Sequence, residues 1–151
     1  MELSSQQLAL QEKAAALSNG MIRTRAADID QSREYPWDVV EALKAERFMG
    51  MTIPPEYGGE GRSFLDTVLV IEEIARSCTV SARIVVEANM GAISTVMAYG
   101  TEAQRKRAAD LVLGGDKPAI CITEPDAGSD ASGMTSDAAD RLFTVKCNMS
   151  A

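Results

Sequence analysis

Apolar residues recur at every third or fourth position through most of the first 113 residues, and this spacing predicts amphipathic helices. Helices are expected over residues 5–30, 36–48, 63–77, 80–98 and 101–113. Three of them start with residues that can form a capping box, namely Ser4 with Gln7, Ser63 with Asp66, and Thr101 with Gln104. Residues 54–61 are rich in proline and glycine and should form a rigid connector between the second and third helices.

The predicted helix over residues 80–98 is apolar around most of its circumference, so we expect it to be buried on nearly all sides. Its small residues Gly91, Ala92 and Ser94 either leave room for a ligand or simply permit close helix packing. Arg83 and Glu87 are four residues apart and can pair with one another. Alternatively, Arg83 faces an acidic group of a substrate.

Two other features of the helices have both a structural and a functional interpretation. Trp37 is the only tryptophan, and we expect it to fill the core rather than to bind a ligand. Glu72 and Glu73 are adjacent, so they point about 100° apart on a helix and cannot converge on one substrate atom. A solvated face is the expected location of this pair.

The pattern changes after Asp116. Short strands are expected over residues 118–123, 134–138 and 142–147. Three strands are too few for an independent sheet, so this second part of the chain should be incomplete on its own. The predicted fold class is therefore mainly α, with a helical domain at 1–117 and a partial β-domain at 118–151.

Composition limits the possible functions. The net charge of −7 gives no electrostatic support for nucleic-acid binding, and the absence of histidine removes the commonest acid–base residue. Three cysteines without metal-ligand spacing suggest free thiols in a reducing compartment, and no metal site is expected. We see neither a signal peptide nor an apolar run long enough to span a bilayer, so a cytoplasmic location is expected.

The candidate functional site is the loop that follows the first expected strand. Pro125 fixes one backbone angle and Gly128 permits unusual ones, so the loop can present main-chain amides to a ligand. An ordinary surface turn is an equally good interpretation of the same residues. The site residues are Ile120, Cys121, Ile122, Thr123, Glu124, Pro125, Asp126, Ala127, Gly128 and Ser129.

Several motifs in a fixed order resemble those of the acyl-CoA dehydrogenase family. The loop T-E-P-D-A-G-S-D at 123–130 resembles that family's flavin-contacting signature. Four further motifs resemble those of the family and occur in the family's order. They are G-M-T-I-P-P-E-Y-G-G-E-G at 50–61, E-E-I-A at 72–75, G-T-E-A-Q at 100–104 and G-G-D at 114–116. The resemblance covers roughly residues 3–138. It implies that the helical part is the N-terminal domain of such an enzyme and that 118–151 begins its β-domain.

The resemblance also implies a chemistry. Members of the family use FAD to oxidise the Cα–Cβ bond of an acyl-CoA thioester, with a carboxylate base taking the Cα proton while the Cβ hydride passes to the flavin. Residues 120–129 would line the flavin, Thr123 would donate a hydrogen bond to its ring, and Ser129 would lie where flavin and acyl-CoA meet. The catalytic base belongs to a C-terminal domain of the family, so no residue of this chain is assigned that role.

The predicted activity is therefore that of the N-terminal portion of an FAD-dependent acyl-CoA dehydrogenase. Residues 108–122 and 90–93 look closest to a desulfinase subgroup that acts on 3-sulfinopropionyl-CoA, and this is the first alternative. A non-catalytic helical subunit is the second. Expected partners are the thioester, the missing C-terminal portion or a partner subunit, further copies in a dimer or tetramer, and electron-transfer flavoprotein for a dehydrogenase.

Overall fold

A computed structural model describes residues 2–120 and 122–135 of the 151-residue chain. Most of these residues are helical, which confirms the mainly α fold class. The contacts divide the chain into two compact units, Met1–Pro118 and a second unit that begins at Ala119. The equivalence of these two units to two functional domains remains a prediction.

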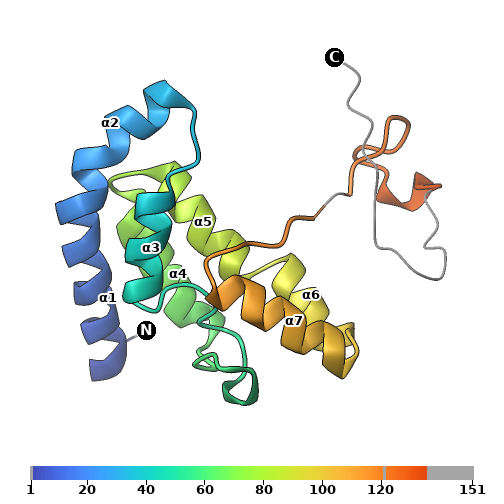
Figure 1. Cartoon of the computed structure of the whole chain (residues 1–151), viewed down its shortest axis with the longest axis horizontal. Helices are drawn as coiled ribbons and strands as arrows, with labels where there is room; N and C mark the ends of the chain where they lie inside the picture. The colour runs from blue at the N-terminus through green and yellow to red at the C-terminus, as the bar shows by residue number, and fades with distance from the viewer. Residues whose placement is uncertain (1, 121, 136–151) are drawn as a thin grey trace. The chain divides into compact units, whose positions relative to one another are not determined.

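The first unit contains seven α-helices in its described residues (Figure 1). Helix α4 packs against both α1 and α5, and α6 lies against α7. Short helical turns of π type and 3-10 type occur at Ser18–Ile22 and Pro55–Tyr57. The helices are α1 (Ser5–Leu17), α2 (Arg23–Ser32), α3 (Trp37–Ala45), α4 (Phe64–Ala75), α5 (Thr79–Asn89), α6 (Ala92–Tyr99) and α7 (Glu102–Leu113).

All three predicted capping boxes are present. In each, the side-chain oxygen of the cap residue accepts the backbone N–H of the residue three positions later. The side-chain oxygen of that later residue accepts the backbone N–H of the cap residue. The donor–acceptor distances at the cap oxygens are 3.2 Å for Ser4, 3.2 Å for Ser63 and 3.4 Å for Thr101. These short-range signals fix where α1, α4 and α7 begin.

Two predicted helices are interrupted in the structure. The first, expected over residues 5–30, contains the π-helical turn, where Gly20 has the non-helical angles φ −88° and ψ −106°. The helix expected over 80–98 is divided into α5 and α6. Gly91 lies between them at φ 65°, a backbone conformation that residues with a side chain rarely adopt. The prediction of one continuous helix at 80–98 was wrong because apolar spacing does not report a main-chain break.

The predictions for two side chains were also wrong. Trp37 is 61% exposed and packs edge-on against Tyr35, with ring centroids 4.7 Å apart, instead of filling the core. Glu73 is buried, while Glu72 is exposed as expected. The Glu73 carboxylate accepts a hydrogen bond of 3.0 Å from Gln11 Nε2 and lies 3.5 Å from an Arg76 amino group. It therefore helps to join α1 to α4.

Asp66 gives α4 a pH-sensitive connection to α1, because Gln7 Nε2 donates to Asp66 Oδ1 at 3.0 Å. Partial burial raises the pKa of the Asp66 carboxyl, but hydrogen bonds from Gln7 and Ser63 outweigh it and hold the pKa below its usual value. A depressed folded-state pKa means that this stabilisation is present above the unfolded-state pKa of about 4 and is lost as the pH falls through the folded-state value.

Asp66→Asn should therefore lower the free energy of unfolding by about 1 kcal/mol at neutral pH, since a capping interaction is weakened. The difference from the wild type should shrink as the pH falls below about 4. Urea unfolding at several pH values measures it. Asp110→Asn, on the exposed side of α7, is the matched control and should show a small difference throughout. A pH-independent difference at Asp66 would contradict the assignment.

The second unit is described up to residue 135. Residues 118–120 and 122–123 are not in a strand, so the first predicted strand is wrong in its described part. Residues 131–133 form a short 3-10 turn. The strand predicted at 142–147 and most of the one at 134–138 lie outside the described residues.

Candidate functional site

The loop predicted to contact a ligand is a tight turn closed by two backbone hydrogen bonds. The Glu124 N–H donates to the Ala127 carbonyl at 3.1 Å, and the Ala127 N–H donates to the Glu124 carbonyl at 3.2 Å. Pro125 occupies the second turn position, where its fixed φ is favoured. Two of the amides that could have faced a ligand are therefore used within the turn itself.

A second set of contacts closes the loop from the other side. The Glu124 carboxylate accepts the Thr135 N–H at 2.9 Å, a contact between residues eleven positions apart. Ser132 donates its hydroxyl to Asp130. These bonds hold the chain from 124 to 135 as one folded loop.

The site residues differ in exposure. Ala127 is 1% exposed and anchors the loop. The other described members are exposed, apart from the partly exposed Glu124, and Cys121 lies outside the described residues. Among the residues that the structure describes, and apart from the two chain neighbours of Gly128, no heavy atom lies within 4 Å of the position that a Gly128 Cβ would occupy. The loop thus presents the hydroxyl groups of Thr123 and Ser129 on exposed residues beside an open main-chain segment, and none of its described residues is in an α-helix.

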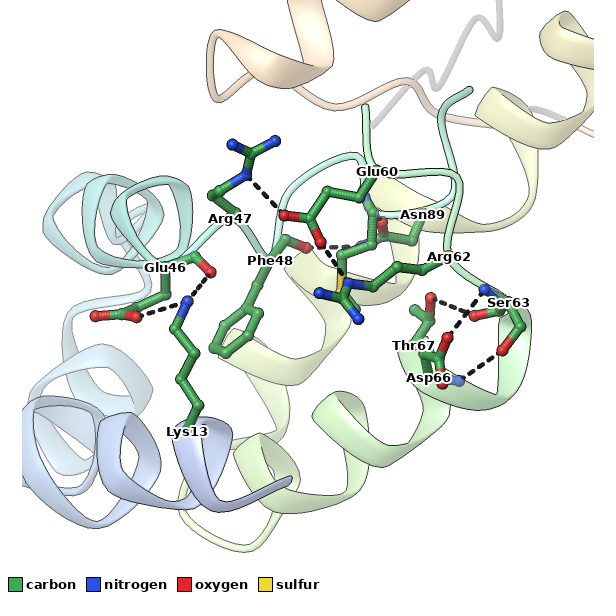
Figure 2. A network of polar contacts seen from close by, with 11 residues as sticks. Lys13, Glu46, Arg47, Phe48, Glu60, Arg62, Ser63, Asp66, Thr67 and Asn89 are labelled. Atoms are coloured by element: carbon green, nitrogen blue, oxygen red, sulfur yellow. Dashed lines mark hydrogen bonds and ion pairs between the residues drawn. The ribbon is translucent and has the colours of Figure 1, made fainter. Parts of the chain in front are cut away.

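The connector at residues 48–62 is ordered by polar contacts in the first unit (Figure 2). Glu60 lies between Arg47 and Arg62, at 2.7 Å from the Arg47 Nε atom. The Lys13 Nζ atom lies 3.1 Å from the Glu46 carboxylate and 5.3 Å from the centre of the Phe48 ring. The connector is thereby tied to α1.

Asn89 is the residue that the sequence analysis missed. It is fully buried at the end of α5, and its side chain bonds three main-chain groups. A buried polar residue directly before an expected helix break could have been recognised as a signal, because buried amides need partners. Apolar periodicity alone passes over it.

Arg83 and Glu87 form the predicted ion pair on α5. The Arg83 side chain is 70% exposed, whereas that of Glu87 is 16% exposed, so the pair presents its positive end to the surroundings.

Comparison with known proteins assigns the helical unit. Residues 4–116 match the family model described as "Acyl-CoA dehydrogenase, N-terminal domain". The chain belongs to the acyl-CoA dehydrogenase family. Among the described helices of this acyl-CoA dehydrogenase homologue, none is both long and apolar enough to span a membrane.

Two curated relatives illustrate the similarity to other members of the acyl-CoA dehydrogenase family. The 3-sulfinopropanoyl-CoA desulfinase of Paraburkholderia xenovorans (strain LB400) is 57% identical over 140 residues, covering 93% of this chain and 36% of that protein. The glutaryl-CoA dehydrogenase of Desulfococcus multivorans is 36% identical over 150 residues, covering 92% of this chain and 37% of that protein. The chain spans about a third of the length of the curated relatives it matches.

A solved structure gives the same family fold. The butyryl-CoA dehydrogenase of Megasphaera elsdenii matches with a TM-score of 0.78 and 26% identity, over 88% of this chain and 36% of that one. The helical arrangement of the acyl-CoA dehydrogenase N-terminal domain is therefore confirmed.

Proposed function

We propose that this chain is the N-terminal part of a flavin-dependent enzyme that removes the sulfinate group from 3-sulfinopropanoyl-CoA. The observation that carries the proposal is the 57% identity to a protein of that name, against 36% for a glutaryl-CoA dehydrogenase over similar coverage. The broader dehydrogenase prediction becomes the second candidate. Residues 108–122, which suggested the desulfinase subgroup, lie in the segment that these comparisons cover.

FAD fits the donor groups of the 122–135 loop. Thr123 and Ser129 carry hydroxyl groups on exposed residues, and the space beside Gly128 lets a planar ring approach the main chain. We propose that residues 120–129 contact the flavin, that Thr123 donates a hydrogen bond to its ring, and that Ser129 lies beside the thioester. Bound there, FAD would supply a polarising surface for the thioester carbonyl and, in a dehydrogenase, a hydride acceptor.

An anionic sulfinate requires a cationic partner in the enzyme, because an unpaired charge is costly to desolvate. Arg83 is the proposed partner, since α5 presents its guanidinium outward while Glu87 holds one side of it. The small residues Gly91, Ala92 and Ser94 would leave room for the short acyl group. None of these residues needs to transfer a proton.

No carboxylate of the described residues is assigned as a catalytic base. Glu124 accepts hydrogen bonds from Thr135, Glu73 joins α1 to α4, and Glu87 is paired with Arg83. Desulfination of the thioester consumes water as its second reactant. The C–S bond breaks, the carbon gains a proton, and the sulfur adds water to leave as hydrogen sulfite, so no external electron acceptor is consumed.

Dehydrogenation would instead release two electrons per turnover and would need an acceptor such as electron-transfer flavoprotein. A non-catalytic helical subunit is a third function and would release no product. In either enzymatic case we propose that the remaining portion, or a partner subunit that supplies it, completes the site, and that the complete form is a dimer or tetramer.

A hybrid enzyme tests the proposal. The 140-residue stretch of this chain that aligns with the Paraburkholderia desulfinase would replace the corresponding part of that enzyme. We expect the purified hybrid to retain bound flavin and to release sulfite from 3-sulfinopropanoyl-CoA without an added electron acceptor. Sulfite and flavin absorbance are the two measurements.

Thr123→Val in the hybrid separates the flavin assignment from folding. It should weaken flavin retention while leaving the helical circular-dichroism signal unchanged. Turnover only in the presence of an electron acceptor would favour the dehydrogenase. A folded hybrid with neither flavin nor turnover would reject both enzymatic proposals.

A further inference from the structure

The break between α5 and α6 is built into the main chain. Helix α5 ends at Asn89, Met90 is extended, and Gly91 takes φ 65° and ψ −117° before α6 begins at Ala92. The first bond of α6 runs from the Thr95 N–H to the Gly91 carbonyl at 3.1 Å. The chain therefore changes direction at residues 89–91.

The Asn89 side chain joins this break to the 48–51 segment of the connector. Its Nδ2 atom donates to the Phe48 and Val85 carbonyls, both at 2.8 Å, and its Oδ1 atom accepts the Met51 N–H at 2.5 Å. Figure 2 shows Asn89 directed at the Phe48 main chain. Both amide hydrogens and the amide oxygen are thus used on main-chain groups, one in its own helix and two in the connector.

The main-chain carbonyl of Asn89 adds a second link, this time to α6. It accepts the Thr52 hydroxyl at 2.7 Å and the Ser94 hydroxyl at 3.5 Å. Thr52 and Ser94 both line a surface hollow of about 430 Å³, together with Pro54, Phe64, Met97 and Ala98. One residue therefore fixes the connector side and the α6 side of this hollow relative to each other.

We propose that Asn89 is a positioning residue, which places the first turn of α6 and so sets the space left for the acyl group of the thioester. This inference rests on the proposed function, because that function assigns the acyl group to the neighbourhood of Gly91, Ala92 and Ser94. Asn89 itself is fully buried, and the hydrogen bonds of its side chain go to main-chain groups. It acts through the turn that it holds.

The test compares Asn89→Ala with Ser18→Ala in the hybrid enzyme. Ser18 is a matched control, because it is also buried and its hydroxyl donates to the Glu73 carbonyl at 2.6 Å, where the π-helical turn after α1 contacts α4. We expect Asn89→Ala to raise KM about tenfold with kcat within about twofold, since lost hydrogen bonds displace the binding wall and leave the reacting groups unchanged. Ser18→Ala should destabilise the protein without this change in KM.

Hydrogen exchange on the 151-residue chain provides a readout that does not need turnover. In Asn89→Ala the amides of α6 should exchange about tenfold faster relative to those of α1. In Ser18→Ala the amides of α1 should instead exchange faster relative to those of α6. Thr52→Val removes one bond to the Asn89 carbonyl and replaces Asn89→Ala if that variant does not fold. It should give a smaller change of the same kind.

Equal KM values for the two alanine variants, or unchanged relative exchange in α6, would overturn the positioning role. An inactive wild-type hybrid would count against the proposed function instead. In that case the exchange experiment alone decides whether Asn89 positions α6.

Discussion

Gly59→Ala is expected to lower the free energy of unfolding of the helical unit by about 3 kcal/mol or more. A Cβ atom on Gly59 would lie 2.0 Å from the Ile53 carbonyl oxygen, which belongs to the main chain and cannot rotate away. That same oxygen accepts the Gly61 N–H at 2.9 Å, so a shift that relieved the clash would break a bond inside the connector. Thermal unfolding should show a midpoint lower by about 10 °C.

Gly114→Ala is the matched control for this prediction. Gly114 lies at the end of α7 with right-handed helical angles, and the nearest atom to its added Cβ is 3.1 Å away. Its unfolding free energy should stay within about 0.5 kcal/mol of the wild type. If the two variants lose similar amounts of unfolding free energy, the close approach between Gly59 and the Ile53 carbonyl is not the reason that position 59 requires glycine.

Arg83→Met should reduce kcat/KM of the hybrid enzyme for 3-sulfinopropanoyl-CoA by about 10- to 100-fold, with most of the effect in KM. A hydrogen bond to a charged group contributes about 1.5–3 kcal/mol, and methionine keeps an aliphatic stem of similar length without the charge. Steady-state kinetics with sulfite release as the readout measures the change. A neutral acyl-CoA of similar length should bind the variant and the parent hybrid equally well.

Arg76→Met is the control, because Arg76 is also an exposed arginine paired with a glutamate four positions away, at the C-terminal cap of α4. It is 60% exposed and lies 3.6 Å from the Glu72 carboxylate four residues before it. Its replacement should leave KM unchanged. If Arg76→Met raises KM as much as Arg83→Met does, the effect of Arg83 reflects net charge and the proposed sulfinate contact is wrong.

The sequence predicted the features of this fold that depend on short-range signals. The three capping boxes, the helical class and the Arg83–Glu87 pair follow from residues three or four positions apart, and the structure contains all of them. The loop motif at 123–130 was located by the resemblance of its residues to a family pattern. The role of that loop remains a prediction.

The incorrect predictions depended on tertiary contacts. Glu73 shares a helical face with Leu69 and Val70, which are four and three positions before it and both buried, so the same periodicity that predicted α4 also turns one of the two adjacent glutamates inward. Its partner Gln11 comes from α1, 62 positions away, and no local pattern reports that contact. Likewise, the break after Asn89 depends on the distant carbonyl of Phe48 and N–H of Met51.

The contact between Glu124 and Thr135 has a consequence for the thermodynamics of cofactor binding. Because the loop is closed by its own hydrogen bonds, at the 124–127 turn and again at residue 135, much of the conformational entropy of these residues is lost when the chain folds. A flavin arriving at a preorganised loop would gain more net affinity from each contact than it would from a loop that had to be ordered on binding. The glutamate of the T-E-P motif would then strengthen cofactor binding by ordering the loop, beyond its own proposed contact with the flavin.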